Sequence, residues 1–301
     1  MKIPVGVVGF GNLGKAVAKT LSQSDEFKLV AVFSKRNLDG TVSFSKVDEY
    51  KDKIKILFVC GGSQNELEEQ TLNLIKNFNT IDCYDNHDRL KGYISKMDRL
   101  AKENKKVALC ALGWDPGLFS LMRGLFSALG FLPYTFWGKG LSQGHTQAVK
   151  NIPGVIDALQ FTIPSKKYIN KIKNGKRVAH GKHLHMRECF VVANKNDRAE
   201  IEKQIRTMKN YFEGYKTSVK FVSQQKLDKM KSFKHKGEVV SQNNVMNFSL
   251  NLKSNPNFTA KVMVRYAKNF ITLLNENNFG AYTILDLPIK NIMDKNKSNL
   301  L

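Results

Sequence analysis

Three glycines near the N-terminus have a spacing that can hold a phosphate. In "GVVGFGNLGKAV", Gly9, Gly11 and Gly14 follow a short apolar run and open a segment with helical spacing. In such a turn the first glycine permits the tight bend, the second lets a pyrophosphate approach the backbone, and the third lets the helix pack against the strand. The helix N-terminus adds N–H groups that attract the anion. We therefore expect a dinucleotide here, contacted also by Asn12 and Leu13.

The end of the next apolar run indicates which dinucleotide binds. "KLVAVF" is followed by Ser34, Lys35 and Arg36, at the place where an NAD-binding turn carries a carboxylate for the ribose hydroxyl. A carboxylate would repel a 2′-phosphate, whereas arginine pairs with it through two hydrogen bonds. The two cations favour NADP over NAD. A solvated basic turn in a lysine-rich chain is the alternative interpretation.

Three more polar turns, each containing glycine or a carboxylate, follow apolar runs: "CGGSQNE", "YDNHD" and "LGWDPG". Because ligands of open parallel sheets bind outside the carboxyl ends of the strands, we expect these turns to line one crevice. Two carboxylates at a nicotinamide site, Asp85 and Asp115, would suit a cationic substrate such as an amine. The candidate cofactor contacts in these turns are Cys60, Gly61, Gly62, Ser63, Gln64, Asp85, Asn86, His87, Gly113, Trp114, Asp115, Pro116 and Gly117.

The elements that position these turns follow a regular order. Up to "KVALCAL", short apolar runs alternate with helical patterns, which indicates β-α-β units and a parallel sheet. Later segments such as "ALQFTIP" and "HMRECFVVA" alternate polar and apolar residues, as a mixed or antiparallel sheet does. We predict an α/β protein. A doubly wound Rossmann-type dinucleotide-binding domain spans 1–117, with the segment 268–301 returning to it, and an α+β domain spans 118–267.

The chain is strongly basic, but this charge alone does not indicate a nucleic-acid partner. Lysine and arginine number 48 against 26 acidic residues, a net charge of +22. The basic residues are scattered and no nucleic-acid motif is present, whereas an electrostatic footprint requires clustering, so we expect no nucleic-acid partner. The longest apolar run, "ILFVC", is far too short to span a membrane. The N-terminal segment has the pattern of a first strand and not of a signal peptide.

The cysteines and histidines do not form a metal-binding pattern. Cys60, Cys83, Cys110 and Cys189 include no C-x-x-C pair, and we expect free thiols in a reducing cytoplasm. The run "HGKHLH" invites a metal site, but a solvated start of a strand is the favoured interpretation, and we expect no metal.

Longer stretches of the chain resemble one family. "GWDPGLFSLMR", "TFWGKGLSQGH" and "ALQFTIPS" occur in order, followed by "HMRECFVVA", "IRTMKNYFEGY" and "NPNFTA". Over nearly its whole length the sequence resembles the NADP-dependent meso-diaminopimelate dehydrogenases. The resemblance implies reversible oxidative deamination of meso-2,6-diaminopimelate at its D-centre, giving L-2-amino-6-oxopimelate and ammonium for lysine and cell-wall biosynthesis. It also implies a cytoplasmic homodimer, with the second domain binding substrate and forming the dimer.

The same resemblance assigns roles to individual residues. Asp85 and Asp115 would face the reacting centre as the catalytic pair, and which of them, or a water, takes the proton stays open. Arg187 would clamp a carboxylate. Trp137 would contact substrate, although a core position is the alternative for a large aromatic residue. The substrate contacts implied in this way are Asp85, Asp115, Trp137, Gln143, Gly144, Thr162, Arg187, His235 and Asn255.

The sequence departs from the family pattern in three places. Lys35 stands where the family commonly has a second arginine, "CGGSQNE" differs from the usual third turn, and the region around His235 lacks a glycine-rich loop. Two other functions stay open at this point. One is a different NADP-linked dehydrogenase of the same architecture, such as a D-amino-acid dehydrogenase. The other is a basic protein that uses a nucleotide-binding scaffold to bind nucleic acid.

Overall fold

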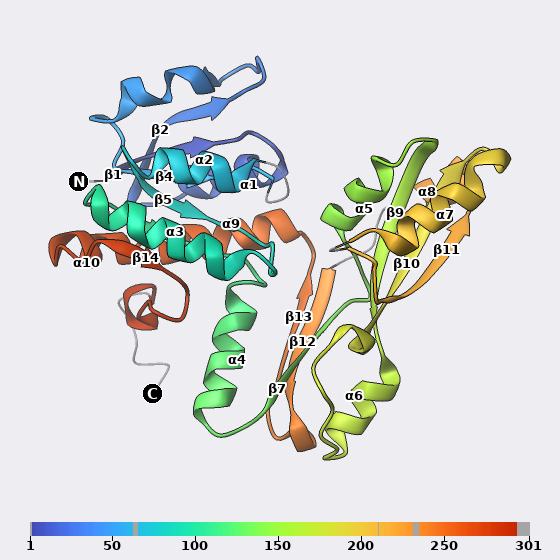
Figure 1. The fold of residues 1–301 in the computed structure, drawn as a ribbon. Coiled ribbons are helices and arrows are strands. Elements are labelled where there is room, and N and C mark those ends of the chain that lie inside the picture. Colours follow the sequence, from blue (N-terminus) through green and yellow to red (C-terminus); the bar gives the residue numbers. More distant parts are fainter. Residues whose placement is uncertain (1, 63–65, 210, 231–234, 294–301) are drawn as a thin grey trace. The chain divides into compact units, whose positions relative to one another are not determined.

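The chain divides into two units. The computed structural model in Figure 1 describes residues 2–62, 66–209, 211–230 and 235–293. Unit 1 comprises Met1–Leu121 and Asn255–Leu301, and unit 2 comprises Met122–Ser254. Within the described part of the chain, no helix is long and apolar enough to cross a membrane.

Unit 1 is built on a parallel sheet of seven strands. Their order is β14 (Gly280–Tyr282), β6 (Val107–Leu109), β5 (Asn79–Asp82), β4 (Ile56–Val59), β1 (Ile3–Val8), β2 (Phe27–Ser34) and β3 (Val42–Ser43). Every neighbouring pair in this sheet is parallel. From β1 the chain runs first toward β2 and later back past β1 to β4. The order of the strands therefore reverses at β1, which is where an open α/β sheet binds its ligand.

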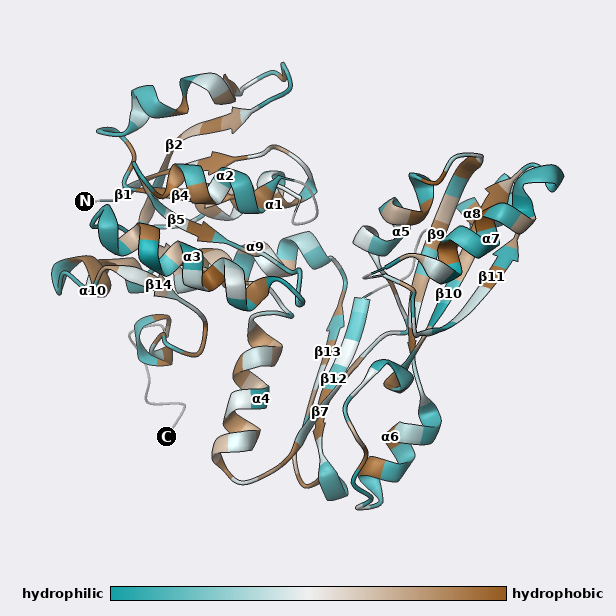
Figure 2. Cartoon of the chain, in the orientation of Figure 1, coloured by the Kyte–Doolittle hydropathy of each residue, from teal (hydrophilic) through white to brown (hydrophobic). Residues whose placement is uncertain are grey.

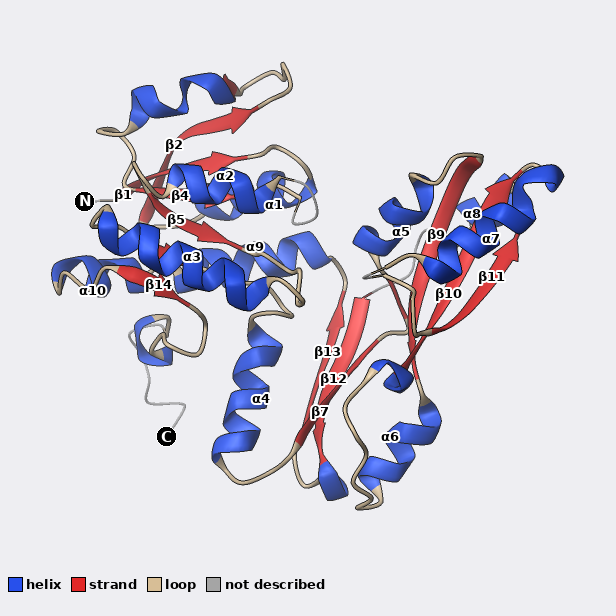
Figure 3. Ribbon diagram, viewed as in Figure 1, coloured by secondary structure: helices blue, strands red, loops and turns tan. Residues whose placement is uncertain are grey.

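Helices cover both faces of this sheet (Figures 1 and 3). Neighbouring residues of one strand enter opposite cores: Val7 packs in the cluster with Val17 of the first helix, whereas Val8 packs in the cluster with Met97. This alternation follows from the two-residue period of a strand. Figure 2 shows the strands as mainly hydrophobic and the outer sides of the helices as mixed. The helices of unit 1 are α1 (Asn12–Ser22), η1 (Phe44–Tyr50), α2 (Leu67–Leu74), α3 (Leu90–Glu103), α9 (Asn255–Tyr266), α10 (Asn269–Asn275) and η5 (Ile289–Asn291).

The unit boundaries differ from the predicted ones, because α9 packs into the first core. Residues 118–121 and 255–267 are predicted to lie in the second domain, but both segments belong to unit 1. Ala260 and Met263 on α9 are fully buried in the same cluster as α1. The segment 255–275 forms two helices, α9 and α10. The predicted return of the chain to the first domain therefore begins earlier, at Asn255.

Unit 2 contains two smaller sheets. One is mixed, in the order β11 (Lys216–Phe221), β10 (His185–Ala193), β9 (Val155–Pro164) and β8 (Gly140–Leu141), and in it only β10 and β11 are parallel. The other is antiparallel, in the order β13 (Asn247–Leu252), β12 (His235–Ser241) and β7 (Pro133–Trp137). The helical elements are α4 (Leu118–Ala128), which begins in unit 1, and α5 (Gln143–Lys150), α6 (Lys166–Lys173), η2 (Lys182–Leu184), η3 (Lys195–Asp197), α7 (Arg198–Thr207), α8 (Gln224–Asp228) and η4 (Gln242–Asn244).

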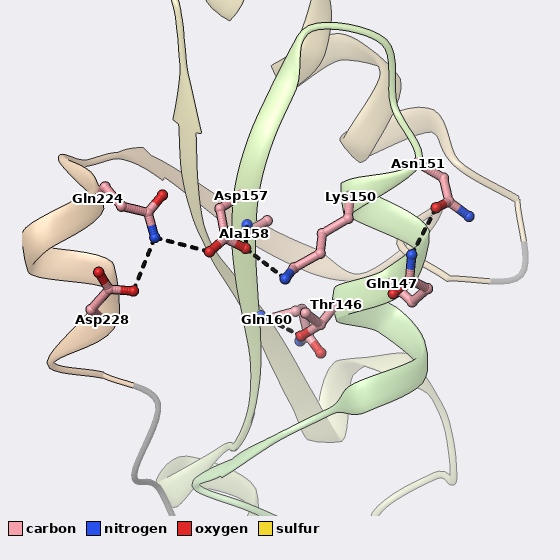
Figure 4. A network of polar contacts seen from close by, with 9 residues as sticks. All are labelled: Thr146, Gln147, Lys150, Asn151, Asp157, Ala158, Gln160, Gln224 and Asp228. Atoms are coloured by element: carbon pink, nitrogen blue, oxygen red, sulfur yellow. Dashed lines mark hydrogen bonds and ion pairs between the residues drawn. The ribbon is translucent and has the colours of Figure 1, made fainter. Parts of the chain in front are cut away.

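A polar network holds α5 and α8 to strand β9 (Figure 4). Lys150 Nζ lies 2.6 Å from Asp157 Oδ1, and Gln224 Nε2 donates to both Asp157 Oδ2 and Asp228 Oδ1 at 3.0 Å. Burial raises the pKa of Asp157, but the hydrogen bonds from Lys150 and Gln224 outweigh it, so this pKa lies below its usual range. Backbone N–H of Gln160 donates to Thr146 Oγ1 at 2.9 Å. These bonds fix α5, whose first residues include two substrate candidates.

Candidate functional site

The three glycines form the turn from β1 into α1, and an added side chain would have a different effect at each of them. Gly9 has a φ of +92° and donates its N–H to the carbonyl of Phe33 at 2.8 Å. A Cβ on Gly14 would lie 1.8 Å from the carbonyl oxygen of Gly9, whereas a Cβ on Gly11 would meet nothing within 4 Å. Gly14 therefore permits helix packing, and Gly11 leaves open space in front of the backbone. That space is the cradle that a pyrophosphate needs.

The N-terminus of α1 has no side chain of its own to satisfy it. Gly11 is the N-cap, makes no side-chain cap hydrogen bond, and no acidic residue stands in the first turn. Asn12 is exposed and Leu13 is half-buried. The first N–H groups of a helix carry partial positive charge and attract anions. The residues present at this turn therefore fit the phosphates of a dinucleotide.

The end of β2 presents two exposed cations. Ser34 is buried, and its Oγ accepts the backbone N–H of Arg36 at 3.0 Å, which shapes the turn. The Arg36 guanidinium donates to the carbonyl of Phe10 at 3.4 Å, so it lies over the glycine turn. Lys35 Nζ lies 3.4 Å from Glu66 Oε1 with both side chains about half exposed. The positions of Arg36 and Lys35 fit a 2′-phosphate, with Glu66 as a competing anion beside them.

The turns after β4 and β5 lie at the same edge of the sheet, because their strands are parallel neighbours. Cys60 is buried, and burial raises the pKa of its thiol. Gly61 is half-buried and Gly62 is exposed, so these two residues are the accessible part of the turn. Two candidates of this turn, Ser63 and Gln64, fall outside the described residues. After β5, Asp85 and His87 are exposed and Asn86 is half-buried.

The turn after β6 is tightly folded on itself. Gly113 donates to the carbonyl of Pro116 at 3.0 Å, and a Cβ on Gly117, whose φ is +129°, would lie 1.9 Å from the carbonyl of Gly113. Trp114 is half-buried and its ring stands 5.4 Å from that of Phe119. Asp115 is only 8% exposed. The carboxylate of Asp115 is therefore largely shielded from solvent.

A second set of candidates meets on the sheet of β9 and β10 in unit 2. Thr162 and Arg187 are register partners, and Arg187 Nη1 donates to Thr162 Oγ1. The guanidinium lies 4.3 Å from the centre of the Tyr215 ring. Arg187 is 7% exposed, burial lowers its pKa, and its Nε has no hydrogen-bond partner among the described residues. A buried arginine with no carboxylate partner in the described chain is suited to bind an anionic ligand group.

Trp137 contacts His185, which lies two residues before Arg187 on β10 and was not among the predicted site residues. The backbone N–H of Trp137 donates to His185 Nε2 at 2.9 Å, and the two rings stack with centroids 4.8 Å apart. His185 is 4% exposed, and burial together with the charge of Arg187 lowers its pKa to about 3. A Cβ on Gly138 would lie 2.0 Å from the carbonyl of Thr162, so this loop packs tightly on β9.

The remaining substrate candidates have different degrees of support. His235 begins β12 half-buried; burial lowers its pKa, and a hydrogen bond to the backbone of Leu141 acts against this. Leu141 immediately precedes the segment that leads into α5, where Gln143 is the first and Gly144 the second helical residue. Asn255 begins α9 in unit 1, and its Oδ1 accepts a hydrogen bond from Thr259 at 3.2 Å. The structure therefore brings Trp137, Thr162 and Arg187 together within unit 2.

His185 corrects one sequence interpretation. The run "HGKHLH" is predicted to be a solvated start of a strand, but its last histidine is buried, while His180 and His183 are exposed. The two-residue offset between His185 and Arg187 on one strand, which places both on one face, was the available signal. Tyr215 has no comparable signal, because only the parallel pairing of β10 with β11 brings it near.

Comparison with known proteins agrees with this arrangement. The family model of the diaminopimelic acid dehydrogenase C-terminal domain matches residues 113–254. The meso-diaminopimelate D-dehydrogenase of Ureibacillus thermosphaericus is 39% identical over 99% of this chain and 98% of its own. The Corynebacterium glutamicum DAP dehydrogenase in complex with DAP superposes with a TM-score of 0.92 at 34% identity, over 99% of this chain and 98% of the other.

A second solved structure, which contains a bound cofactor, is also similar to this chain over its full length. An engineered D-amino acid dehydrogenase bound to NADP+ has a TM-score of 0.88 at 33% identity, over 100% of this chain and 98% of its own. The predicted α/β class with a Rossmann-type first domain is confirmed by these likenesses and by the parallel sheet of unit 1. Full-length identity at this level, together with the glycine turn and the buried arginine, places the chain in the meso-diaminopimelate D-dehydrogenase family.

Proposed function

We propose that the protein catalyses the NADP-dependent oxidative deamination of meso-2,6-diaminopimelate at its D-centre. Substrate, NADP+ and water would give L-2-amino-6-oxopimelate, ammonium, NADPH and a proton, and the reaction is reversible. The observation that carries the proposal is the likeness over 99% of the chain to relatives of that name. The glycine turn and Arg187, which has no carboxylate partner among the described residues, support it independently, because they supply a dinucleotide cradle and an anion site.

For the cofactor, the proposal assigns three groups of residues. The turn from Gly9 to Gly14 would take the pyrophosphate, and Ser34, Lys35 and Arg36 the 2′-phosphate. The turns after β4, β5 and β6 would line the nicotinamide end. When bound, NADP+ supplies the hydride acceptor. The protein itself has to bind the cofactor and the substrate, orient them toward each other and exclude competing reactions.

At the reacting centre, we propose that Asp85 and Asp115 bind the amino group of the substrate and accept its proton. An ammonium must lose a proton before hydride leaves its carbon, so that an imine forms and water then releases ammonium. Asp115 is the more buried of the pair, which favours a fixed hydrogen bond to the substrate, whereas Asp85 is exposed and can exchange protons with solvent. These roles distribute positioning and proton transfer between the two carboxylates.

We propose a separate set of contacts for the distal amino-acid end of the substrate. Arg187 would bind the distal carboxylate bidentately, with Thr162 as a further hydrogen-bond partner. Trp137, Gln143, Gly144, His235 and Asn255 would complete the contacts. We further propose a cytoplasmic homodimer with no nucleic-acid or membrane partner, for which size-exclusion chromatography with light scattering is the test.

The experiment mixes the purified protein with one isomer of diaminopimelate and either NADP+ or NAD+ at alkaline pH, and follows the absorbance of reduced nicotinamide. We expect turnover with the meso isomer and NADP+, and none with the LL isomer, which lacks a D-centre. No reduction with the meso isomer would overturn the proposal. Turnover with other D-amino acids but not with the meso isomer would instead assign a different D-amino-acid dehydrogenase.

A further inference from the structure

A buried carboxylate lies beneath the two turns that carry the proposed reacting acids. Asp82 is the last residue of β5 and is fully buried. Its Oδ1 accepts the backbone N–H of Tyr84 at 2.9 Å and that of Ala111 at 3.0 Å. Its Oδ2 accepts the hydroxyl of Tyr93, on α3, at 2.6 Å. One side chain therefore joins the end of β5, the end of β6 and a covering helix.

The two backbone donors stand directly before functional turns. Tyr84 precedes Asp85, and Ala111 opens the turn that leads to Asp115. The carbonyl oxygen of Asp82 also accepts the N–H of Leu112 at 2.8 Å, so the second turn is bound at two points. Ala111 has a φ of +58°, a conformation that a non-glycine residue adopts only when its surroundings impose it. The hydrogen bonds from Ala111 and Leu112 to Asp82 supply that constraint.

Burying the carboxylate of Asp82 costs free energy of folding. Burial raises the pKa of Asp82, against the lowering effect of its hydrogen bonds, and burial also raises the pKa of the neighbouring Tyr93 and Cys110. A buried carboxylate is costly even when it is hydrogen-bonded. The same strand offers a contrast in Thr80, which is equally buried but whose hydroxyl has no partner in the described chain. Asp82 differs from Thr80 in holding two turns.

We propose that Asp82 is a positioning residue that fixes the turn bearing Asp85 relative to the turn bearing Asp115. It contacts neither substrate nor cofactor and acts through the backbone of both turns. The inference rests on the proposed function for its effect on turnover. Its structural half, that Asp82 holds the turn after β6, stands on the hydrogen bonds alone.

The chain offers a graded set of variants. Asp82→Asn keeps an oxygen that accepts both backbone N–H groups, and its amide can donate to the hydroxyl of Tyr93. Asp82→Val has a similar size but no acceptor. Thr80→Val is the matched control, because it removes a buried hydroxyl that bonds to nothing in the described residues. Only Asp82→Val removes the acceptor of the Tyr84 and Ala111 N–H groups, while the hydrogen bond from Leu112 to the backbone carbonyl of residue 82 remains in all three variants.

The first readout separates turnover from binding. For Asp82→Val we expect kcat with meso-diaminopimelate to fall about a hundredfold, since an error of about 1 Å in position has that effect. The Kd for NADP+ should change less than about threefold, because the glycine turn is untouched. Asp82→Asn should keep kcat within about threefold of the wild type, as should Thr80→Val. Wild-type kcat in Asp82→Val, or an equal loss in Asp82→Asn, would overturn the proposal.

The second readout does not require activity. Trp114 and Trp137 are the two tryptophans, so a Trp137→Phe background leaves Trp114 as a fluorescent reporter of the turn after β6. We expect acrylamide quenching of Trp114 to increase at least about twofold on Asp82→Val and not on Asp82→Asn or Thr80→Val, because only the first leaves the N–H of Ala111 without its acceptor. If the wild-type protein does not oxidise meso-diaminopimelate, the proposed function fails while this readout still decides the role of Asp82.

A third measurement uses the wild-type chain, in case Asp82→Val does not fold. Hydrogen exchange resolved at single amides should show the N–H groups of Tyr84 and Ala111 strongly protected, because both are buried and bonded. Exchange at the rate of open amides would overturn the proposal without any variant.

Discussion

Replacing Gly14 with alanine tests the cofactor turn most sharply. The new methyl group would lie 1.8 Å from the carbonyl oxygen of Gly9 and 2.9 Å from its carbon. Favourable contacts between such atoms begin at roughly 3.5 Å, so α1 or the turn must retreat by more than an ångström. Overpacking of this kind costs about 1–3 kcal/mol, and backbone against backbone belongs at the upper end. We expect Gly14→Ala to lower the free energy of unfolding by about 3 kcal/mol. We also expect it to abolish NADP binding.

Two other glycines serve as controls for that result. At Gly11 an added Cβ meets nothing within 4 Å, so we expect Gly11→Ala to change stability by less than about 0.5 kcal/mol. It should still lower NADP affinity by about tenfold or more, because its methyl occupies the space that the pyrophosphate needs. Gly92 lies exposed within α3 with nothing near it, and Gly92→Ala should stabilise by about 0.5–1 kcal/mol.

Thermal or denaturant unfolding and calorimetric titration with NADP+ measure these three variants side by side. The expected pattern is loss of both stability and binding at Gly14, loss of binding alone at Gly11, and neither at Gly92. Wild-type stability and affinity in Gly14→Ala would refute the close packing of α1 on the turn. Wild-type affinity in Gly11→Ala would refute the approach of the dinucleotide to this backbone.

Four further predictions concern single side chains. Glu66→Gln removes the carboxylate beside Lys35, so NADP+ should bind about two- to threefold more tightly at low salt, as titration at two ionic strengths would show; the gain is small because the pair is exposed. Arg187→Met should raise the KM for meso-diaminopimelate about a hundredfold in steady-state assays, with Kd for NADP+ unchanged, because a bidentate partner of a carboxylate is lost; an unchanged KM would exclude this clamp. Asp115→Asn should lower kcat about a hundredfold or more while NADP+ still binds by titration; unaltered turnover would remove Asp115 from the mechanism. His185, with a pKa of about 3 instead of 6.5, leaves the unfolded chain binding more protons between those values, so stability falls as pH drops through that window; unfolding across the window should be less pH-dependent in His185→Asn, and an equal dependence would contradict the buried neutral ring.

Local sequence patterns predicted the parts of the fold that depend on short-range geometry. The spacing of Gly9, Gly11 and Gly14 predicted the turn between β1 and α1, because the positive φ of Gly9 and the close packing of Gly14 on its carbonyl are local to that turn. Apolar runs likewise indicated the parallel strands of unit 1. The segment "GEVVSQNNVMNFSLNLK" was less clear, since it forms two strands, β12 and β13, around a turn in which Asn243 and Asn244 have positive φ.

Features that depend on distant packing were not accessible in this way. Nothing local shows that α9 packs against α1, because the contact joins segments near opposite ends of the sequence. The burial of His185 depends on its contact with Trp137, 48 residues away. Asp82 is one letter in "TIDCYD", and its importance arises only where the N–H of Ala111, 29 residues on, meets it. The roles of the predicted site residues stay predictions until the variants are measured.

The most direct test of the central claim follows the hydride itself. meso-Diaminopimelate deuterated at its D-configured α-carbon is incubated with the protein and NADP+, and the reduced cofactor and the product are examined by mass spectrometry and NMR. We predict deuterium at the reduced nicotinamide, one ammonium released per cofactor reduced, and L-2-amino-6-oxopimelate as the product. Reduction of NADP+ without deuterium transfer, or no reduction at all, would contradict the account.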